Sequence, residues 1–255
     1  MIGMLKTFET YAEELGLELF KVEVEQTLSE EELSEIIPNF DGWIIGDDPA
    51  TRRVLRIGSE GRLRAAVKWG IGVDNVNFEA CKDYGINIEN TPGMFGKEVA
   101  DIAIGYVIAL ARQTFYIDRQ IRKGAWPKPV GISLNEKVAA VIGFGDIGKN
   151  TVERLKALGM NILVYDPFIK EKYSAQNISY AKWPERINEA DFIIMNCALT
   201  KSSFHMINSE VFPKMKNGVR IVNVGRGQLI EESSLINFLN SGKVHSVALD
   251  VFEVE

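Results

Sequence analysis

Cysteine and histidine are scarce in this chain. Its 255 residues include two cysteines, Cys81 and Cys197, and two histidines, His205 and His245. Neither cysteine has a second cysteine or a histidine at the spacing of metal ligands, so the sequence predicts no metal site and no disulfide framework. We interpret both cysteines as buried thiols in a reducing compartment and predict a cytoplasmic protein.

An excess of positive charge and long apolar runs are missing as well. The formal net charge is −6 at pH 7, which disfavours a nucleic-acid partner held by general electrostatics. No segment approaches the roughly 20 apolar residues that a membrane span needs, and the first residues lack the pattern of a secretory signal. With 46% apolar and 25% charged residues, the sequence predicts a globular protein without a membrane or nucleic-acid partner.

The second part of the chain alternates between apolar strands and helices. Strands are predicted at residues 137–142, 161–165, 192–197, 219–224 and 246–251, and helices at residues 147–158, 209–216 and 231–240. Strands that are apolar along their whole length and joined by helices are typical of a parallel sheet with both faces covered. We predict an α/β protein with a Rossmann-type doubly wound parallel sheet, which binds ligands beyond the carboxyl ends of its strands.

The first part of the chain predicts a smaller α/β domain of the flavodoxin-like type. Its expected strands are residues 22–24, 42–46, 63–69 and 86–88, and its expected helices are residues 1–19, 30–37 and 78–84. A turn at residues 90–93 precedes a long apolar helix over residues 97–123. We place the domain boundary at this turn, which divides the chain into residues 1–94 and 95–255.

A glycine-rich turn joins the first predicted strand of the second domain to its helix. The segment Gly143-Phe144-Gly145-Asp146-Ile147-Gly148 has the spacing of a dinucleotide fingerprint. Gly143 permits a tight turn, Gly145 lets a pyrophosphate approach the backbone, and Gly148 allows the helix to pack closely on the strand. The start of the helix offers unpaired N–H groups to the phosphates. The alternative is a turn that needs glycine only for its own geometry.

Asp166 indicates which dinucleotide this turn binds. It ends the strand that follows the glycine turn, where an acid can accept hydrogen bonds from both hydroxyls of the adenosine ribose. Its charge also repels a 2′-phosphate. We therefore predict NAD rather than NADP as the cofactor, although two lysines, Lys170 and Lys172, follow closely.

Two polar motifs follow later strands of the same predicted sheet. The segment Ile221-Val222-Asn223-Val224-Gly225-Arg226-Gly227 places Arg226 just past the carboxyl end of a strand, where substrates bind. A guanidinium donates two parallel hydrogen bonds to a planar carboxylate and can polarise a neighbouring ketone oxygen. Asp250 ends the last predicted strand at the same edge of the sheet. Taken singly, the two motifs are also compatible with a surface arginine and a solvated acidic loop.

Together these segments resemble the D-isomer-specific 2-hydroxyacid dehydrogenases, with the phosphoglycerate dehydrogenase branch as the nearest resemblance. The glycine turn, Asp166 and residues 222–227 and 249–255 are similar to the family's nucleotide domain, and residues 91–101 look like its beginning. The segment Gly70-Ile71-Gly72-Val73-Asp74-Asn75 is similar to the family's loop for the substrate carboxylate. The resemblance implies an NAD-dependent oxidoreductase for a D-2-hydroxy acid or 2-oxo acid, with its substrate domain at 1–94 and its NAD-binding domain at 95–255.

The resemblance also implies roles for individual residues. Arg226 would bind and polarise the 2-oxo acid, and Glu255 would orient a histidine that acts as general acid and base at the ketone oxygen. The backbone N–H groups of Ile71 and Gly72 would hold the substrate carboxylate. The other residues would bind NAD, with Asp146 and Ile147 at the pyrophosphate and Thr200, Val224 and Asp250 along the track from adenosine to nicotinamide.

The two ends of the chain depart from the family's pattern. The family's catalytic histidine follows the glutamate by a few tens of residues, whereas this sequence stops at Glu255. Neither His205 nor His245 matches it, and we expect a structural or surface role for both. The family's first strand also has no counterpart before the helix expected at residues 1–19. We therefore expect a chain shortened at both ends that turns over 2-oxo acids poorly by itself.

One loop bears on the substrate. Relatives that act on 3-phosphoglycerate carry a basic residue after the strand at 42–46, whereas this chain has Asp47 and Asp48 there. Two acids near the substrate disfavour a second anionic group on it. Arg52 and Arg53 come slightly later in the chain, and a phosphorylated substrate remains an open alternative.

Two further interpretations of the same residues concern activity and assembly. A catalytically silent NAD-binding interaction or sensor protein on this fold is an alternative to an active dehydrogenase, and a truncated NAD-binding fragment is another, because fold alone does not decide function. Members of the family are usually dimers through the long helix of the nucleotide domain. The apolar face from Ala100 to Ala111 is compatible with such a homodimer.

Overall fold

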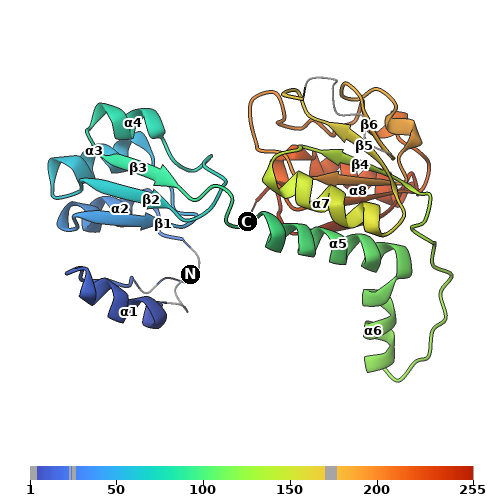
Figure 1. Ribbon diagram of the computed structural model, residues 1–255, viewed down its shortest axis with the longest axis horizontal. Helices are drawn as coiled ribbons and strands as arrows, with labels where there is room; N and C mark the ends of the chain where they lie inside the picture. The colour runs from blue at the N-terminus through green and yellow to red at the C-terminus, as the bar shows by residue number, and fades with distance from the viewer. Residues whose placement is uncertain (1–4, 23, 25–26, 170–176, 255) are drawn as a thin grey trace. The chain divides into compact units, whose positions relative to one another are not determined.

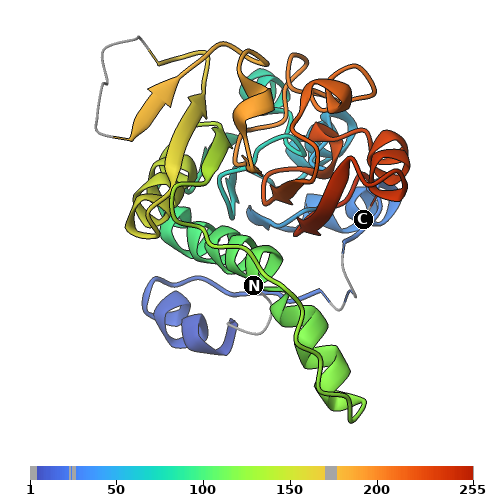
Figure 2. The same ribbon diagram turned by 90° about the vertical axis from the view of Figure 1, so that its right-hand side faces the viewer.

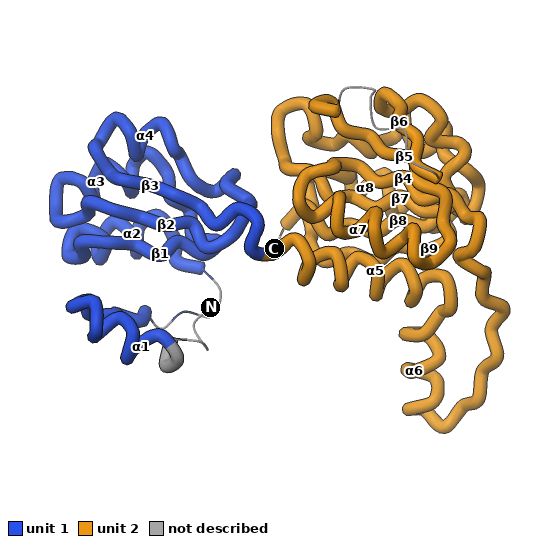
Figure 3. The backbone as a smooth tube through the Cα atoms, viewed as in Figure 1, with its two compact units in different colours: residues 1–94 blue, residues 95–255 orange. Residues whose placement is uncertain are grey.

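The computed structural model describes residues 5–22, 24, 27–169 and 177–254. The chain forms two compact units, residues 1–94 and residues 95–255 (Figure 3). Each unit contains its own parallel sheet and its own hydrophobic core. None of the described helices combines the length and the apolar composition that crossing a bilayer requires.

The first unit is a three-stranded parallel sheet packed against helices. The strands lie in the order β1 (Gly42–Ile45), β2 (Ala65–Lys68) and β3 (Asn87–Asn90). The core joins buried side chains of these strands to those of α2 (Glu30–Ile36), α3 (Arg52–Glu60) and α4 (Phe78–Asp83). Ser29 caps α2, and its side chain and that of Glu32 form a reciprocal capping box. No helix was expected at α3, because most of its residues are polar and too few apolar residues recur to indicate a helical face.

The beginning of the chain differs from the expectation. The helix expected at residues 1–19 is shorter, because α1 (Leu5–Glu14) ends before Gly16. Gly16 adopts φ +69, and its N–H and that of Leu17 bond back to the last turn, which is how glycine closes a helix. The prediction of a strand at residues 22–24 is wrong for Val22 and Val24, which lie outside any strand. The residue between them, Glu23, is outside the described residues.

The second unit is built on a six-stranded sheet in which every pair of neighbours is parallel. Its strand order is β6-β5-β4-β7-β8-β9. The strands are β4 (Val138–Ile142), β5 (Asn161–Tyr165), β6 (Ile178–Tyr180), β7 (Phe192–Met195), β8 (Val219–Asn223) and β9 (Val244–Leu249). The chain thus begins at the centre, runs outward to β6, and then returns across β4 to build the other half from β7. This is the order of a doubly wound Rossmann sheet, so the predicted fold class is confirmed.

Helices cover both faces of this sheet (Figure 1). On one face, α5 (Gly96–Arg112) and α7 (Asp146–Ala157) pack on alternate strand residues such as Val141 and Val164. On the other face, α8 (Glu232–Asn240) and the short helix η4 (Phe212–Lys214) pack on the residues between them. Burial on both faces explains why the strands are apolar without alternation.

Two helix predictions in this unit are wrong. The helix expected at residues 97–123 breaks at Gln113, which adopts φ +57 and separates α5 from α6 (Thr114–Arg122). The helix expected at residues 209–216 is reduced to η4, because Pro213 lacks an N–H and its ring clashes with the carbonyl four residues earlier in an α-helix. His245 lies inside β9, as its second residue, rather than before it.

Candidate active site

The turn between β4 and α7 is shaped by two glycines that have no room for a side chain. Gly143 has φ +89, and a Cβ atom on it would lie 2.7 Å from Cα of Cys197. A Cβ atom on Gly148 would lie 2.0 Å from the carbonyl oxygen of Gly143, so α7 starts in contact with the turn. A Cβ atom on Gly145 would meet nothing within 4 Å. The turn is therefore tightly packed at Gly143 and Gly148 and open at Gly145, the N-cap of α7.

The two glycines at the start of α7 predict opposite effects of the same substitution. We expect Gly148→Ala to lower the free energy of unfolding by about 1–3 kcal/mol, because its Cβ atom meets backbone that cannot move aside. Gly145→Ala meets open space, so stability should stay close to that of the parent while NADH binds about tenfold more weakly. Urea unfolding and NADH fluorescence titration measure the two quantities. Equal stability of the two variants would contradict this account of the turn.

The turn lies at the switch point of the sheet. β4 pairs with β5 on one side and β7 on the other, so the connections leave their carboxyl ends in opposite directions, and doubly wound sheets bind ligands at such a point. Cys197, two residues after β7, packs against Gly143 across this point, and burial raises the pKa of its thiol to about 11. The thiol therefore stays protonated at neutral pH and serves as packing rather than as a nucleophile.

Asp166 connects two backbone segments at this edge. It follows β5, and its Oδ2 accepts a hydrogen bond from the N–H of Phe144 over 2.7 Å. Its Oδ1 accepts from the N–H of Phe168 over 2.8 Å. Each carboxylate oxygen can accept a further hydrogen bond, so Asp166 can brace the glycine turn and still receive a ribose hydroxyl. Lys170 and Lys172, which qualified the choice of NAD, are outside the described residues.

Arg226 is presented by a loop that Asn223 folds. Asn223, the last residue of β8, is 1% exposed. Its Oδ1 accepts from the N–H of Gly225 over 3.0 Å, and its Nδ2 donates to the carbonyl oxygen of Arg226 over 2.9 Å. Arg226 is half-buried, and its Nη1 donates to the carbonyl oxygen of Gly225 over 2.9 Å. Asn223 was not among the predicted site residues, although an asparagine shortly before Gly-Arg-Gly is a sequence signal for a turn of this kind.

The remaining residues predicted to line the NAD track lie at the same edge. Val224 is buried directly after β8, and Thr200 is exposed in the loop after β7. Asp250 comes directly after β9, and its Oδ1 accepts a hydrogen bond from the hydroxyl of Tyr106 in α5 over 2.9 Å. Burial, together with this carboxylate, raises the pKa of Tyr106. The structure thus gathers the carboxyl ends of β4, β5, β7, β8 and β9, with their polar residues, along one edge of the sheet.

Unsatisfied polar groups at this edge fit a polar ligand. Asn196 directly follows β7, and its side-chain amide oxygen and nitrogen are buried without a hydrogen-bond partner among the described residues. Buried amide groups are nearly always paired, so an orphaned pair at the switch point indicates a place that a ligand or water fills. With the open face of Gly145 and the free acceptor capacity of Asp166, the residues present fit a dinucleotide.

In the first unit, the loop at residues 70–75 follows β2. Gly70 has φ +145, and its N–H donates to Oγ1 of Thr91 over 3.0 Å. Ile71 is 41% exposed and Gly72 is half-buried. Within the described part of the chain, neither of their N–H groups donates a backbone hydrogen bond. Two adjacent unpaired N–H groups can receive a carboxylate, as the resemblance implies for this loop.

A buried lysine stands next to this loop. Lys68, the last residue of β2, is 3% exposed. Its Nζ contacts the carbonyl oxygen of Gly46 and lies 3.2 Å from Oδ1 of Asp47. Nothing in the sequence singled out this residue, and Asp47 was taken to be an acid without a neighbouring cation. The ion pair places a cation beside that acid and weakens the argument that the loop repels an anionic substrate.

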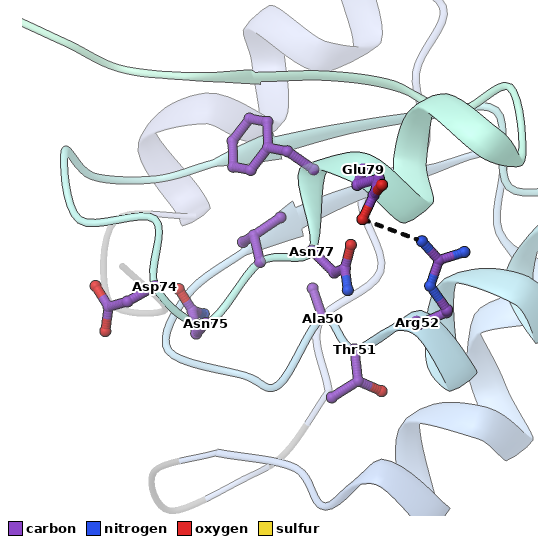
Figure 4. A pocket seen from close by; sticks show the side chains of 9 residues that line it. Ala50, Thr51, Arg52, Asp74, Asn75, Asn77 and Glu79 are labelled. Carbon is purple, nitrogen blue, oxygen red and sulfur yellow. Dashed lines mark ion pairs between the residues drawn. The ribbon is translucent and has the colours of Figure 1, made fainter. Parts of the chain in front are cut away.

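The first unit also has a shallow pocket beside the same loop (Figure 4). It lies where α3 and α4 begin, and Arg52 and Glu79 form an ion pair of 3.5 Å at one side of it. Thr51 and Asn77 cap their own helices with their side chains. These polar groups are thus satisfied by the protein itself, and we assign no ligand to the pocket. Its lining consists of Ala50, Thr51, Arg52, Asp74, Asn75, Val76, Asn77, Phe78 and Glu79.

Comparison with known proteins agrees with this geometry. The profile of the D-isomer specific 2-hydroxyacid dehydrogenase family, NAD binding domain, matches residues 104–255. The chain belongs to this family. The family predicted from the sequence, the Rossmann NAD-binding domain and the cofactor, NAD, are thereby confirmed. The interpretation as an NAD-dependent oxidoreductase of the D-2-hydroxyacid dehydrogenase type is confirmed as well.

Individual family members show how far the similarity extends. A hydroxypyruvate reductase from Thermotoga maritima is 38% identical over 92% of this chain and 78% of its own length. A chloroplastic D-3-phosphoglycerate dehydrogenase from Arabidopsis thaliana is 36% identical, and the chain spans 42% of that relative's length. The structure of an NAD+-bound 3-phosphoglycerate dehydrogenase from Entamoeba histolytica has a TM-score of 0.79 at 28% identity, covering 99% of this chain and 77% of that one.

The site residues predicted from the sequence of this chain are divided between its two units. The cofactor residues and Arg226 lie in the second unit, and Ile71 and Gly72 lie in the first. Glu255, predicted to orient the catalytic histidine, is outside the described residues. His205, for which a structural or surface role was expected, contacts the carboxylate of Glu253 close to the loop of Arg226.

Proposed function

We propose that the protein catalyses NAD-dependent interconversion of a D-2-hydroxy acid and a 2-oxo acid, as its family does. The observation that carries this proposal is the Arg226 loop, which shares one edge of the sheet with an open glycine turn and Asp166. A guanidinium at the carboxyl edge of a dinucleotide-binding sheet is suited to a carboxylate or ketone oxygen. The nicotinamide of bound NAD supplies the hydride chemistry.

The protein's own residues take the roles of binding and orientation. The N–H groups of Ile71 and Gly72 hold the substrate carboxylate, and Arg226 donates to the substrate and polarises its oxo group. Asp146 and Ile147 offer backbone N–H groups to the pyrophosphate at the start of α7. In the proposed scheme, Glu255 orients the histidine that exchanges a proton with the substrate oxygen. The other cofactor contacts come from Asp166, Thr200, Val224 and Asp250.

The substrate proposed here is a small 2-oxo acid of the kind that phosphoglycerate dehydrogenase-like members take. Lys68 supports an anionic or hydroxylated substituent, since its buried ammonium group ends β2 directly before the carboxylate loop. A Cβ atom on Gly70 would lie 3.8 Å from Cε of Lys68, which places the lysine chain along the loop. Asp47 offsets part of this charge. Two relatives are named for hydroxypyruvate, a 2-oxo acid that NADH reduces, and for 3-phosphoglycerate, a 2-hydroxy acid that NAD+ oxidises, so these two acids are the first to try, each in its own direction.

The test of this function is consumption of NADH by the full-length protein in the presence of candidate acids. We expect turnover with 2-oxo acids, and none with 3-oxo acids or with the amides of the same 2-oxo acids, because the carboxylate must lie next to the reacting carbonyl. NADH loss is followed by absorbance and product by chromatography. Equal turnover of 2-oxo acids, 3-oxo acids and the amides would contradict the proposal.

We further propose that the protein forms a homodimer through the second unit. Much of the apolar face of α5 that suggested a dimer is already used, since Ala100 is buried and Val107 and Ala111 pack in the core against the sheet. On α5 itself, Ile102 and Ile108 stay exposed. More exposed apolar surface lies on α6, which has no buried residue and extends away from the body of its unit (Figure 2). Exposed apolar side chains are Phe115, Tyr116 and Ile121 on α6, and Trp126 and Val130 in the segment that follows it. Surface of this kind is typical of an interface with a second copy.

A charge on α6 is expected to separate this dimer. Ile121 is 47% exposed on α6, so Ile121→Asp should leave the fold intact but desolvate a carboxylate in the interface. Light scattering should give the mass of two chains for the parent and the mass of one chain for the variant. Tyr11→Asp, at an exposed aromatic of the first unit, serves as the control and should remain dimeric. A monomeric parent would contradict the homodimer.

We also propose a cytoplasmic location. Cys81 and Cys197 are both free thiols, and Cys81 is buried with a pKa raised by burial. Free thiols persist in reducing compartments. Fractionation of cells that express the tagged full-length protein tests this location, and recovery from an organelle would contradict it.

A further inference from the structure

The segment after β9 lies directly on the loop that carries Arg226. A Cβ atom on Gly227 would stand 1.8 Å from the carbonyl oxygen of Phe252, so the two backbones touch with no side chain between them. Gln228 Nε2 also donates to the carbonyl oxygen of Glu253 over 2.9 Å. Because packed backbone transmits displacement, any shift of residues 252–253 moves the arginine loop as well.

Glu253 ties its own segment to the first turn of α8. Its N–H donates to Oε1 of Glu232 over 2.8 Å, and its Oε2 accepts from the N–H of Glu232 over 3.2 Å. This reciprocal pair has the pattern of a capping box that is formed between two separate segments. The second oxygen of Glu253, Oε1, is left to bind another partner.

That partner is His205. Its Nε2 contacts Oε1 of Glu253, and its backbone N–H donates to the carbonyl oxygen of Gln228 over 2.8 Å. The residue thus bonds to the arginine loop with its backbone and to the segment after β9 with its imidazole. Phe204 stacks on the imidazole with 4.0 Å between the ring centroids. An Nε2–H group donates to a carboxylate in both the protonated ring and the matching neutral tautomer.

The backbone of His205 is held in an unusual conformation. Its φ is +47, in the left-handed region that residues other than glycine adopt rarely. Such a conformation persists only where the surroundings enforce it, and it often occurs near functional sites. Here the enforcing contacts are the hydrogen bond to Gln228 and the contact with Glu253.

We propose that His205 is a positioning residue for Arg226. With Glu253 it clamps residues 252–253 onto the loop at 226–228, while Asn223 holds the same loop through the carbonyl oxygen of Arg226. The clamp keeps the guanidinium in the orientation that receives the 2-oxo acid. This inference rests on the proposed function, because it assigns His205 a role in substrate binding and not in fold stability alone.

Hydrogen exchange tests the clamp without requiring turnover. In the full-length protein, His205→Ala and Glu253→Ala should speed amide exchange in the peptides that contain residues 226–229 and 250–254. Glu253→Gln keeps an acceptor oxygen for His205 but loses the charge, so its effect should be smaller than that of Glu253→Ala. His245→Ala, at the other histidine and exposed on β9, is the matched control and should leave both peptides unchanged. Native exchange in both peptides of His205→Ala would overturn the clamp.

Kinetics separate positioning from a merely structural role. His205→Ala should lower kcat/KM for the 2-oxo acid by about 100-fold through misplacement of Arg226, with NADH affinity unchanged. A structural role would instead lower thermal stability and weaken NADH and substrate binding together. Faster exchange with unchanged kcat/KM would overturn the positioning role. A parent protein that reduces no 2-oxo acid would overturn the proposed function, whereas the exchange rates decide the clamp independently.

Discussion

Replacement of Arg226 by alanine is expected to lower kcat/KM for the 2-oxo acid by about 1,000-fold, because a preorganised donor to the reacting oxygen is lost. The guanidinium also donates in two parallel directions, which no other side chain reproduces. Arg226→Lys keeps the charge without that geometry and should show a smaller loss, of about 10- to 100-fold. Both values come from NADH consumption by the full-length protein at varied substrate concentration.

The controls for this prediction use the cofactor. Arg226 follows β8, whereas the glycine turn follows β4, so NADH titration should give the same affinity for the parent and both variants. The same measurements distinguish an active dehydrogenase from an NAD-sensing interaction protein, which would keep partner binding when Arg226 is replaced. Full activity of Arg226→Ala would remove the arginine from the proposed site.

Replacement of Asp166 by alanine is expected to reduce the preference for NADH over NADPH by about 100-fold. A carboxylate at the end of β5 accepts the ribose hydroxyls and repels a 2′-phosphate, and like charges in contact cost several kcal/mol. NADH should bind more weakly as well, since Asp166 accepts the N–H of Phe144 and thereby holds the glycine turn. Fluorescence titration with both dinucleotides measures the two effects.

A neutral variant separates the effect of the charge of Asp166 from that of its hydrogen bond to the glycine turn. Asp166→Asn retains one acceptor oxygen for the N–H of Phe144 but lacks the charge. We therefore expect it to lose discrimination nearly as fully as Asp166→Ala while it binds NADH more tightly than that variant. If both variants keep the preference of the parent, another residue selects the cofactor.

The sequence predicted five of the six strands of the second unit, because they are short apolar runs between turns. The edge strand β6, of three residues, was not predicted. The helices were harder to predict. The break at Gln113 leaves the apolar pattern of α5 and α6 uninterrupted, and nothing in a polar glutamine indicates φ +57. The α3 helix was missed for the opposite reason, since only Val54, Leu55 and Gly58 of its nine residues are buried.

The site could be predicted where backbone geometry demands a particular residue. Glycines beside Asp166 and Arg226 carry such a signal, because the turn and the loop exclude any Cβ atom at Gly143, Gly148 and Gly227. Lys68 and His205 carried none. Their importance comes from partners that are distant in the chain, at Asp47 and Glu253, and only folding reveals such pairs.

The most direct test of the central claim is the stereochemistry of the oxidation. The full-length protein is given NAD+ and one pure enantiomer of a 2-hydroxy acid, such as glycerate or lactate, and NADH formation is followed by absorbance. A D-2-hydroxyacid dehydrogenase should form NADH with the D enantiomer and none with the L enantiomer. NADH formation with the L enantiomer alone, or with neither across a panel of 2-hydroxy acids, would contradict the account.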